Sequence, residues 1–340
     1  MATLTAGAFG TDIDQLDINS LLLGFASGQS STGFTLNTNG QVDTFVGSGF
    51  QFGGNGFPTA GVITQITETF SGQMVFDLSG LSVTTPTLLA WAANAGNEVA
   101  RSTMLSGGDL ITGSGLADRL RGYAGNDTIN AGAGNDFVEG GDGNDQVFAG
   151  AGDDVIVDAF GTNYLRGEDG NDVIQGGTGF DDINGNMGND TLSGGDGGDW
   201  VVGGKDNDVL FGEAGGDIVY GNLGDDTCSG GDGDDVVRGG QGNDSVSGGV
   251  GNDYVSGDRG DDTVSGGLGA DLFHGSQDAG IDRVLDFSLA QGDRVMLDPG
   301  TTYTFGQVGA DTVINMGGAN QMILVGVQSS TLTGAWIFLG

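Results

Sequence analysis

The chain has 340 residues, of which 72 are glycine, and its 46 acidic side chains stand against 9 basic ones. The formal net charge of −37 excludes a surface for nucleic acid or for an anionic membrane, because both of these partners are polyanions. No apolar run approaches the roughly eighteen residues that a membrane-spanning helix needs, and the single cysteine, Cys228, excludes an intramolecular disulfide.

The first 103 residues carry no repeat and are expected to form a β-rich N-terminal domain. Several of their segments alternate apolar and polar side chains and are rich in Thr, Val and Phe, which predicts antiparallel strands joined by Gly and Asn turns. These expected strands are 31–38, 41–52, 61–70 and 73–83. Short helices are expected at 12–25 and 87–94.

The central part of the chain, residues 104–274, repeats every nine residues. Blocks such as GGDGNDQVF (140–148) and GGQGNDSVS (239–247) keep one register, with 18 blocks in 162 residues after a degenerate first block. The sixth position is Asp in every block except one, which has Asn163, and the eighth is apolar throughout if Cys228 is counted as a small hydrophobe. A disordered segment would have no reason to keep a constant nine-residue register. The register therefore excludes disorder, although the content of glycine and of charged residues is high.

The nine-residue period predicts a coil of short strands and tight turns. Glycines at positions 1, 2 and 4 supply the unusual backbone conformations of a turn, and the last three residues of each block, such as 128–130, are expected to form a very short strand. Two blocks per turn place the eighth side chains from both sides in a thin apolar core. The expected fold class is therefore all-β, with a parallel β-roll in the centre of the chain.

Charge requires a cation in this roll. Residues 104–274 hold 33 acids and 6 bases, and the sixth-position carboxylates recur within a few ångströms of one another. Calcium relieves such repulsion, because it binds six to eight carboxylate and carbonyl oxygens. One histidine, His274, and one cysteine, Cys228, cannot build a zinc or copper site.

The blocks resemble the G-G-x-G-x-D-x-U-x nonapeptide of the repeat-in-toxin (RTX) calcium-binding family. The resemblance implies a parallel β-roll with several Ca²⁺ ions between loops one turn apart, held by backbone carbonyls and by the sixth-position aspartates. Two loops depart from the pattern, DAFGTN (158–163) and GGKDND (203–208), and calcium there is expected to be weak or missing. The implied ligands are Asp118, Asp127, Asp136, Asp145, Asp154, Asp172, Asp181, Asp190, Asp199, Asp217, Asp226, Asp235, Asp244, Asp253, Asp262 and Asp271.

Residues 275–340 resemble the segment that caps RTX rolls. GIDRVLDF (280–287) and GDRVMLD (292–298) carry this likeness, and strands are expected at 310–316 and 321–327. A cap covers the apolar side chains and unpaired backbone of the last turn. The resemblance also implies an uncleaved C-terminal signal for type I secretion. It agrees with the N-terminus, which lacks the basic residues of a Sec-type signal peptide.

No catalytic motif emerges from the sequence. One histidine cannot supply the H-E-x-x-H of a zinc protease, and GLSVT (80–84) fails the G-x-S-x-G of an esterase at its last residue. A Ser-His-Asp triad would need His274 beside a distant serine. The chain is therefore expected not to be an enzyme.

The sequence supports three functions of different classes. The first is a secreted, extracellular, calcium-binding structural protein of a bacterial surface, matrix or biofilm, which self-assembles in calcium. The second is an adhesin whose N-terminal domain binds a surface glycan or a partner protein, and the third is a calcium-dependent hydrolase. The first is favoured by an outward apolar column, which is expected to contact another copy of the chain. Its members are Trp200, Ile218, Tyr220, Val236 and Tyr254.

Overall fold

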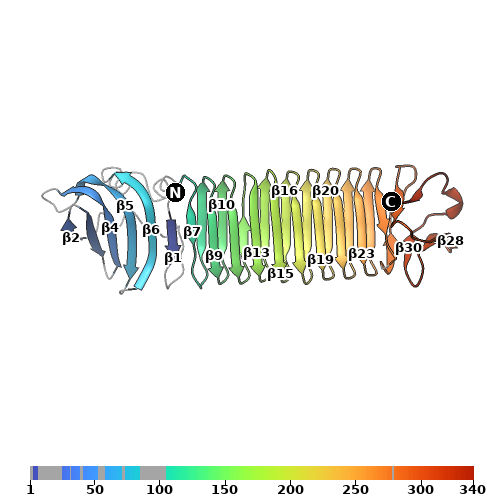
Figure 1. Cartoon of the computed structure of the whole chain (residues 1–340), viewed down its shortest axis with the longest axis horizontal. Coiled ribbons are helices and arrows are strands. Elements are labelled where there is room, and N and C mark those ends of the chain that lie inside the picture. Colours follow the sequence, from blue (N-terminus) through green and yellow to red (C-terminus); the bar gives the residue numbers. More distant parts are fainter. Residues whose placement is uncertain are drawn as a thin grey trace. The chain divides into compact units, whose positions relative to one another are not determined.

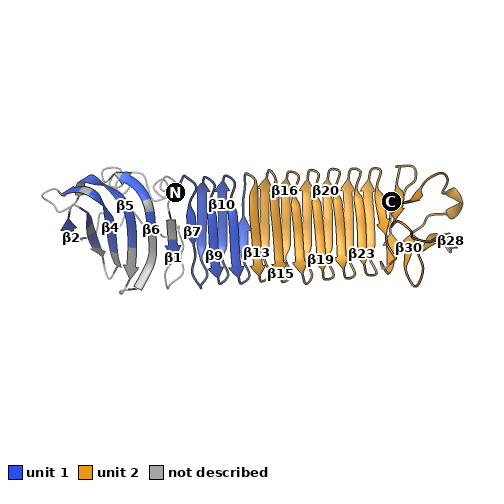
Figure 2. Cartoon of the chain, in the orientation of Figure 1, with its two compact units in different colours: residues 1–160 blue, residues 161–340 orange. Residues whose placement is uncertain are grey.

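The computed structural model describes residues 3–6, 25–30, 32–38, 41–52, 58–70, 73–84, 105–277 and 279–340 (Figure 1). The chain divides into two compact units, Met1–Phe160 and Gly161–Gly340 (Figure 2). In these ranges the regular elements are strands, apart from a single 3-10 turn at Ser329–Thr331. Among the described residues no helix is long and apolar enough to cross a membrane.

The first unit begins with an antiparallel sheet, as the alternating sequence predicts. Strands β2 to β6 pair in chain order, each antiparallel to the next, and β1 pairs antiparallel with β6. Phe45 and Leu78 are 0% exposed, and Ile66, which lies opposite both of them, is 5% exposed, so one face of the sheet is buried and the side chains alternate between apolar and polar. The helices expected at 12–25 and 87–94 lie outside the described residues, except for Phe25, which begins β2. The strands are β1 (Thr3–Ala6), β2 (Phe25–Ser30), β3 (Gly33–Thr38), β4 (Gln41–Phe52), β5 (Pro58–Phe70) and β6 (Gln73–Thr84).

The repeats of the first unit form two parallel ladders. Strands β7, β9 and β11 pair in one ladder, which β1 also joins, and strands β8, β10 and β12 pair in the other. Ile129 lies opposite Val147 and Leu120 opposite Val138, so neighbours in a ladder are 18 residues apart. The strands are β7 (Leu110–Thr112), β8 (Arg119–Ala124), β9 (Thr128–Ala133), β10 (Phe137–Asp142), β11 (Gln146–Ala151) and β12 (Val155–Val157).

The second unit continues the same architecture with its own pair of ladders, confirming the parallel β-roll. Odd-numbered strands β13 to β25 form one ladder, and even-numbered strands from β14 to β24 form the other. Eighth-position side chains are buried between the ladders: Val201, Leu210 and Val219 are 0% exposed. The strands are β13 (Asn163–Asp169), β14 (Val173–Thr178), β15 (Asp181–Met187), β16 (Thr191–Asp196), β17 (Trp200–Lys205), β18 (Val209–Ala214), β19 (Ile218–Leu223), β20 (Thr227–Asp232), β21 (Val236–Gln241), β22 (Ser245–Val250), β23 (Tyr254–Arg259), β24 (Thr263–Leu268) and β25 (Leu272–Gly275).

The expected strand length was wrong. The strand that the sequence places at 128–130 extends over Thr128–Ala133, because the parallel register continues into the next block, where Gly150 lies opposite Gly132. The role of the first glycine also differs from the expectation, since only positions 2 and 4 have positive φ, as at Gly141 (116°) and Gly143 (146°). Position 1 favours glycine for lack of space rather than for conformation, and Ala131 and Ala149 occupy it in two blocks.

The C-terminal strands close the roll of the second unit. Strand β26 extends the ladder of β24, and β27 extends the ladder of β25. Beyond them, β30 and β31 pair in parallel with β26 and β27, while β28, β29 and β30 form an antiparallel meander. The strands are β26 (Ile281–Val284), β27 (Arg294–Leu297), β28 (Thr304–Val308), β29 (Asp311–Asn315), β30 (Gln321–Leu324) and β31 (Ile337–Leu339).

An aromatic cluster covers the last turn. Phe287 lies between Phe273, the last eighth-position side chain, and Trp336, with ring centroids 6.0 and 6.2 Å away. Trp336 is 3% exposed, so the apolar end of the roll is shielded from water.

Candidate metal centre

Sixth-position aspartates are buried along the roll in both units. Aspartate is rarely buried in proteins unless it is paired, yet Asp127, Asp226 and Asp253 are each at most 2% exposed. The predicted set lies at this position throughout, between the end of a turn and the start of a strand. Their exposed fractions are 0–5% for Asp118, Asp127, Asp136, Asp145, Asp154, Asp172, Asp181, Asp190, Asp199, Asp217, Asp226, Asp235, Asp244, Asp253, Asp262 and Asp271.

One carboxylate oxygen of most of these aspartates joins two turns. Oδ1 of Asp244 accepts the backbone N–H of Asp226 at 2.8 Å, and Oδ1 of Asp145 accepts that of Asp127 at the same distance. The same bond recurs along each unit between residues 18 apart, with lengths of 2.7–3.1 Å. The aspartates therefore form a ladder of their own beside the strands.

The second carboxylate oxygen is buried without a hydrogen-bond partner over most of the ladder. An unsatisfied buried acceptor is unfavourable, and such groups are uncommon in native proteins. Their regular recurrence indicates that an additional group completes them. The affected atoms include Oδ2 of Asp127, Asp136, Asp181, Asp190, Asp199, Asp208, Asp217, Asp226, Asp235, Asp244, Asp253 and Asp271.

Backbone oxygens lie close to these orphaned atoms. A Cβ placed on Gly221 would be 2.4 Å from Oδ2 of Asp226 and 2.4 Å from the carbonyl oxygen of Gly239. Gly122 has the same two neighbours, Asp127 and Gly140, at the same two distances. A carboxylate oxygen and a carbonyl oxygen thus lie around one point, which explains why position 1 is glycine in most blocks.

Burial raises the pKa of the ladder carboxyls. Loss of solvation is the main cause, the backbone hydrogen bond to Oδ1 opposes it, and neighbouring carboxylates add to it. The pKa rises to about 7 at Asp127 and Asp244, and to about 6 at Asp136 and Asp235. The ladder therefore favours neutralisation, either by protons or by a bound cation.

The donor set fits a hard cation. In the part of the chain that the structure describes, no group of three His, Cys, Asp or Glu side chains converges on one point, so a bound ion must also use backbone oxygens. Orphaned carboxylate oxygens beside carbonyl oxygens are the ligands that Ca²⁺ prefers. Residues Asp226 and Asp244, with the carbonyl of Gly239, are one example of a set that could hold such an ion.

The structure adds four aspartates that the sequence analysis did not include. Asp208 belongs to the irregular loop 203–208 but is 1% exposed, and its Oδ1 accepts the N–H of Asp190 like any other member. Asp206 occupies the place of the fourth glycine with a φ of 73°, a conformation that Asp tolerates better than most residues. Asp109, Asp282 and Asp293 occupy equivalent places, and their side chains are at most 2% exposed. Only Asp109 and Asp208 fall in the nine-residue phase, where the block pattern could have revealed them.

The other irregular loop keeps its place in the ladder without an aspartate. Asn163 is 2% exposed, and its backbone N–H donates to Oδ1 of Asp181 at 2.9 Å. In the first unit Asp158 stands at the first position of this block, where glycine is usual. A Cβ on Gly140 would lie 2.0 Å from Oδ2 of Asp158, so this carboxyl enters the space that first-position glycines leave open.

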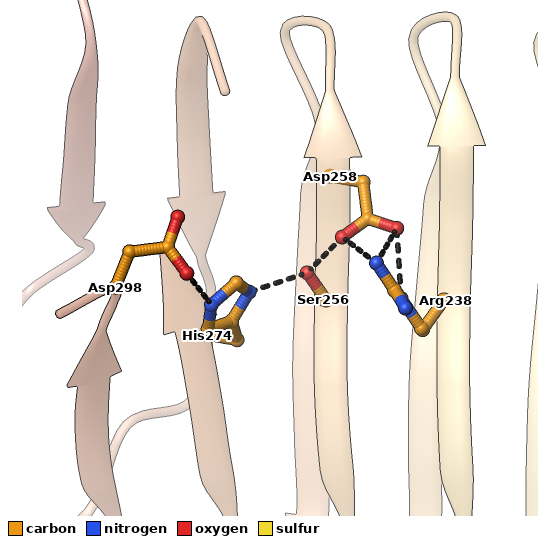
Figure 3. Close-up of polar contacts among 5 residues, drawn as sticks. All are labelled: Arg238, Ser256, Asp258, His274 and Asp298. Carbon is orange, nitrogen blue, oxygen red and sulfur yellow. Dashed lines mark hydrogen bonds and ion pairs between the residues drawn. The ribbon is translucent and has the colours of Figure 1, made fainter. Parts of the chain in front are cut away.

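A second polar cluster lies on the outer face of the second unit (Figure 3). Arg238 donates from Nε and Nη2 to the carboxylate of Asp258, and Ser256 Oγ donates to the same carboxylate at 2.7 Å. Nδ1 of His274 lies 3.3 Å from Ser256 Oγ, and Nε2 lies 3.1 Å from Oδ1 of Asp298. Four of these residues, all except Ser256, line a surface groove of about 390 Å³.

The direction of the hydrogen bond between Ser256 and His274 distinguishes this cluster from a catalytic triad. The one hydroxyl proton of Ser256 is donated to Asp258, so Nδ1 of His274 must donate to Ser256 rather than accept from it. Nε2 faces the carboxylate of Asp298, which can only accept a hydrogen bond. Ser256 is 1% exposed, and the imidazole cannot act as its base in this geometry.

One family model matches the repeats. The RTX calcium-binding nonapeptide repeat matches at 105–138, 122–156, 157–192, 166–201, 193–228, 229–264 and 247–281. Together these matches cover residues 105–281, which is just over half of the 340-residue chain. The chain belongs to the RTX calcium-binding repeat family. RTX repeats of this kind imply Ca²⁺ binding, and the orphaned oxygens of the aspartate ladder are consistent with it.

Two solved structures match part of the RTX chain with low TM-scores. The extracellular lipase LipA from Serratia marcescens matches with 21% identity and a TM-score of 0.27, over 51% of this chain and 40% of the lipase. The AlgE6R3 subunit of a mannuronan C5-epimerase from Azotobacter vinelandii matches with 24% identity and a TM-score of 0.26, over 39% of this chain and 78% of the subunit. A search of curated proteins gives no significant match.

The apolar column of the RTX chain follows one ladder of the second unit. Trp200, Ile218, Val236 and Tyr254 lie opposite one another on successive strands. Trp200 is 49% exposed, whereas Tyr254 is half-buried and stacks on His274 with centroids 5.8 Å apart. Tyr220, beside the column, lies under the guanidinium of Arg238 at 5.6 Å. Trp200 is therefore the most accessible member of the five.

Proposed function

We propose that this RTX chain is a secreted, calcium-dependent structural protein of a bacterial cell surface or extracellular matrix, and that it is not an enzyme. The observation that carries the proposal is the row of buried aspartates, most of which have one oxygen bonded to the previous turn and the other without a hydrogen-bond partner. Calcium between Oδ2 and the first-position carbonyls would satisfy these oxygens and cancel the repulsion along the ladder. The sixth-position aspartates are the proposed ligands.

Calcium then controls when the chain folds. Without a cation, the roll must bury a row of carboxylates that repel one another, so the unfolded chain is favoured at neutral pH. With calcium present, binding free energy becomes folding free energy. A chain with this property leaves a low-calcium cytosol unfolded and folds outside the cell, which supports secretion by a type I pathway through the C-terminal segment.

Self-assembly is the proposed purpose of the folded roll. Trp200 is half exposed in the middle of a column of large strand residues, and apolar surface of this kind is a common feature of contacts between proteins. A second copy of the chain is the proposed partner, because a rigid repetitive face can match the same face of another copy. The net charge of −37 opposes this contact until calcium neutralises part of it.

Circular dichroism of the full chain tests the folding part of the proposal. In a chelator the spectrum should lack most of its β signal, and titration with Ca²⁺ should restore it cooperatively. Magnesium at equal concentration is the control, because its smaller ion demands near-octahedral geometry and gives up water reluctantly. A β-rich spectrum in chelator at neutral pH that calcium does not change would overturn the proposal.

A further inference from the structure

The C-terminal segment of the second unit contains half of a hidden repeat. Residues 280–284, GIDRV, reproduce positions 4 to 8 of the nonapeptide, G-x-D-x-U. Gly280 has a φ of 92° and packs against the fourth-position glycine of the previous turn, Gly260, whose N–H donates to Ala279 at 2.7 Å. The segment is therefore built as another turn of the roll.

The hydrogen bonds of this half-repeat copy those of the regular loops. The N–H of Ile281 donates to Oδ1 of Asp261 at 2.9 Å, as fifth-position residues do along the roll. The N–H of Arg283 donates to the carbonyl of Asp262 at 2.8 Å, and Val284 lies opposite Val264. The spacing from Asp262 to Asp282 is 20 residues instead of 18, and this insertion breaks the nine-residue phase. The family match ends at residue 281, one residue before Asp282.

Asp282 has the environment of an interior ladder member. It is 1% exposed, its carboxyl accepts the backbone N–H of Asp262, and Oδ1 has no hydrogen-bond partner. Oδ2 of Asp262 is also without a partner, and a Cβ on Gly257 would lie 2.2 Å from it. The two buried carboxyls, one turn apart, thus face each other at the junction between the last repeats and the C-terminal segment, close enough to share a proton or a cation. No other group of the protein satisfies Oδ1 of Asp282 or Oδ2 of Asp262.

Asp293 is the corresponding residue of the other ladder, and both of its carboxylate oxygens have hydrogen-bond partners in the protein. Its Oδ1 accepts the N–H of Asp271 at 3.1 Å, and its Oδ2 accepts the N–H of Ser288 at 2.6 Å. Both oxygens of this carboxylate are therefore used by the protein. Asp118 in the first unit is similar, since its Oδ2 accepts from the N–H and Oγ of Ser114 at 2.6 and 2.9 Å. Hydrogen bonds from a serine can thus satisfy the second carboxylate oxygen of a ladder aspartate, so that no cation is needed there.

We propose that Asp262 and Asp282 form a further Ca²⁺ site beyond the nonapeptide repeats, whereas Asp293 ends its ladder through Ser288 and binds no ion. The site rests on the proposed calcium ladder and extends it. It fastens the C-terminal segment to the last turn, because Asp282 lies in β26, the strand that pairs with β24 on one side and β30 on the other. Pairing of the C-terminal segment with the ladder of β24 then depends on calcium, whereas its pairing with the ladder of β25 does not.

Counting bound calcium tests the site. The full chain, refolded in Ca²⁺ and freed of excess ion, is assayed for Ca²⁺ per chain by elemental analysis, beside the variants D282N and D293N. D282N should bind one ion fewer than the parent, because an amide loses the charge while keeping the shape. D293N should bind the same number as the parent. Circular dichroism confirms that the compared chains have the same β content.

The outcomes separate this site from the proposed function. If the parent binds calcium and D282N binds as much, or if both variants lose an ion, the inference is wrong while the calcium ladder stands. If the parent binds none, both are wrong. Should D282N fail to fold in calcium, D282S takes its place in the count, since a hydroxyl can still accept the N–H of Asp262.

Discussion

The backbone N–H of Asp226 donates to Oδ1 of Asp244, 18 residues later and 2.8 Å away, while Oδ2 of Asp244 has no partner. One side chain therefore performs two tasks. It ties its turn to the previous one, and it offers an oxygen and a negative charge to a cation. Removing such a carboxyl should weaken both the roll and its affinity for calcium.

Substituting Asp244 with Ala should raise the calcium concentration at the folding midpoint several-fold and reduce cooperativity. The change removes one ligand and leaves the N–H of Asp226 buried without an acceptor, a loss of about 1–3 kcal/mol. The midpoint is read from circular dichroism during a calcium titration. Asp206→Asn is the matched control, because Asp206 is exposed and Asn tolerates its positive φ equally well. Equal shifts for the two variants would contradict the assignment of the sixth position as the ligand.

Without metal, acid should stabilise the roll. Burial raises the pKa of Asp181 and Asp253 to about 7, above the ordinary value of 3.8 that holds in the unfolded chain. The folded state then binds more protons, so its stability is greatest below about pH 4 and falls as pH rises towards 7. In chelator, the β signal should be stronger at pH 4.5 than at pH 7.5. A signal that grows with pH would show that burial does not raise these pKa values.

Calcium should reverse this pH dependence. The ion binds the ionised carboxylates, so it competes with protons wherever the pKa lies near neutrality. The calcium midpoint should therefore rise as pH falls below about 7, the pKa to which burial raises Asp190 and Asp244. A midpoint that does not change between pH 8 and pH 5 would show that protons and calcium do not share a site.

Gly230→Ala should disrupt a calcium site directly. The added Cβ would lie 2.4 Å from Oδ2 of Asp235 and 2.6 Å from the carbonyl oxygen of Gly248, the two atoms proposed to bind the ion. The variant should need a higher calcium concentration to fold and should bind fewer ions per chain. Gly216→Ala is the control, because its nearest heavy atom would be at 3.4 Å, which is ordinary contact. A Gly230 variant with parental calcium binding would place the ions elsewhere.

The double substitution of Trp200 and Tyr220 by Ser should leave calcium-induced folding intact and abolish self-association. Both side chains are on the outer face of one ladder, so their loss exposes no core. Light scattering in calcium measures the association. Val173→Ser on the other ladder is the control, since Val173 is 40% exposed and apolar but lies outside the column. Assembly of the double variant at the parental level would mean that the interface is elsewhere.

Periodicity determined most of what could be predicted about the roll. A strict nine-residue phase determines which residues face the core, so the buried row through Val201 and Val219 and the 18-residue register follow from counting. Strand length did not follow, because a parallel ladder continues through glycines that carry no apolar signal, as at Gly132 and Gly150.

The membership of the aspartate ladder was harder to predict. The sequence does not predict Asp208 as a ligand, because its loop lacks the fourth glycine, yet Asp206 adopts the positive φ and the loop keeps its form. Asp282 was hidden by a two-residue insertion that only the three-dimensional register reveals. That Asp293 is satisfied by Ser288 depends on a contact from outside the repeat, which no block pattern contains.

The 18-residue register also limits how the second unit can change in length. Each nonapeptide moves the chain from one sheet to the other, so deletion of a single block would transfer every later strand to the opposite side. The column through Trp200 and Tyr254 would then be divided between two faces, and the strand of Asp282 would meet the ladder that now ends at Asp293. Viable relatives of this unit should therefore differ in length by multiples of eighteen residues, and insertions of nine should be selected against.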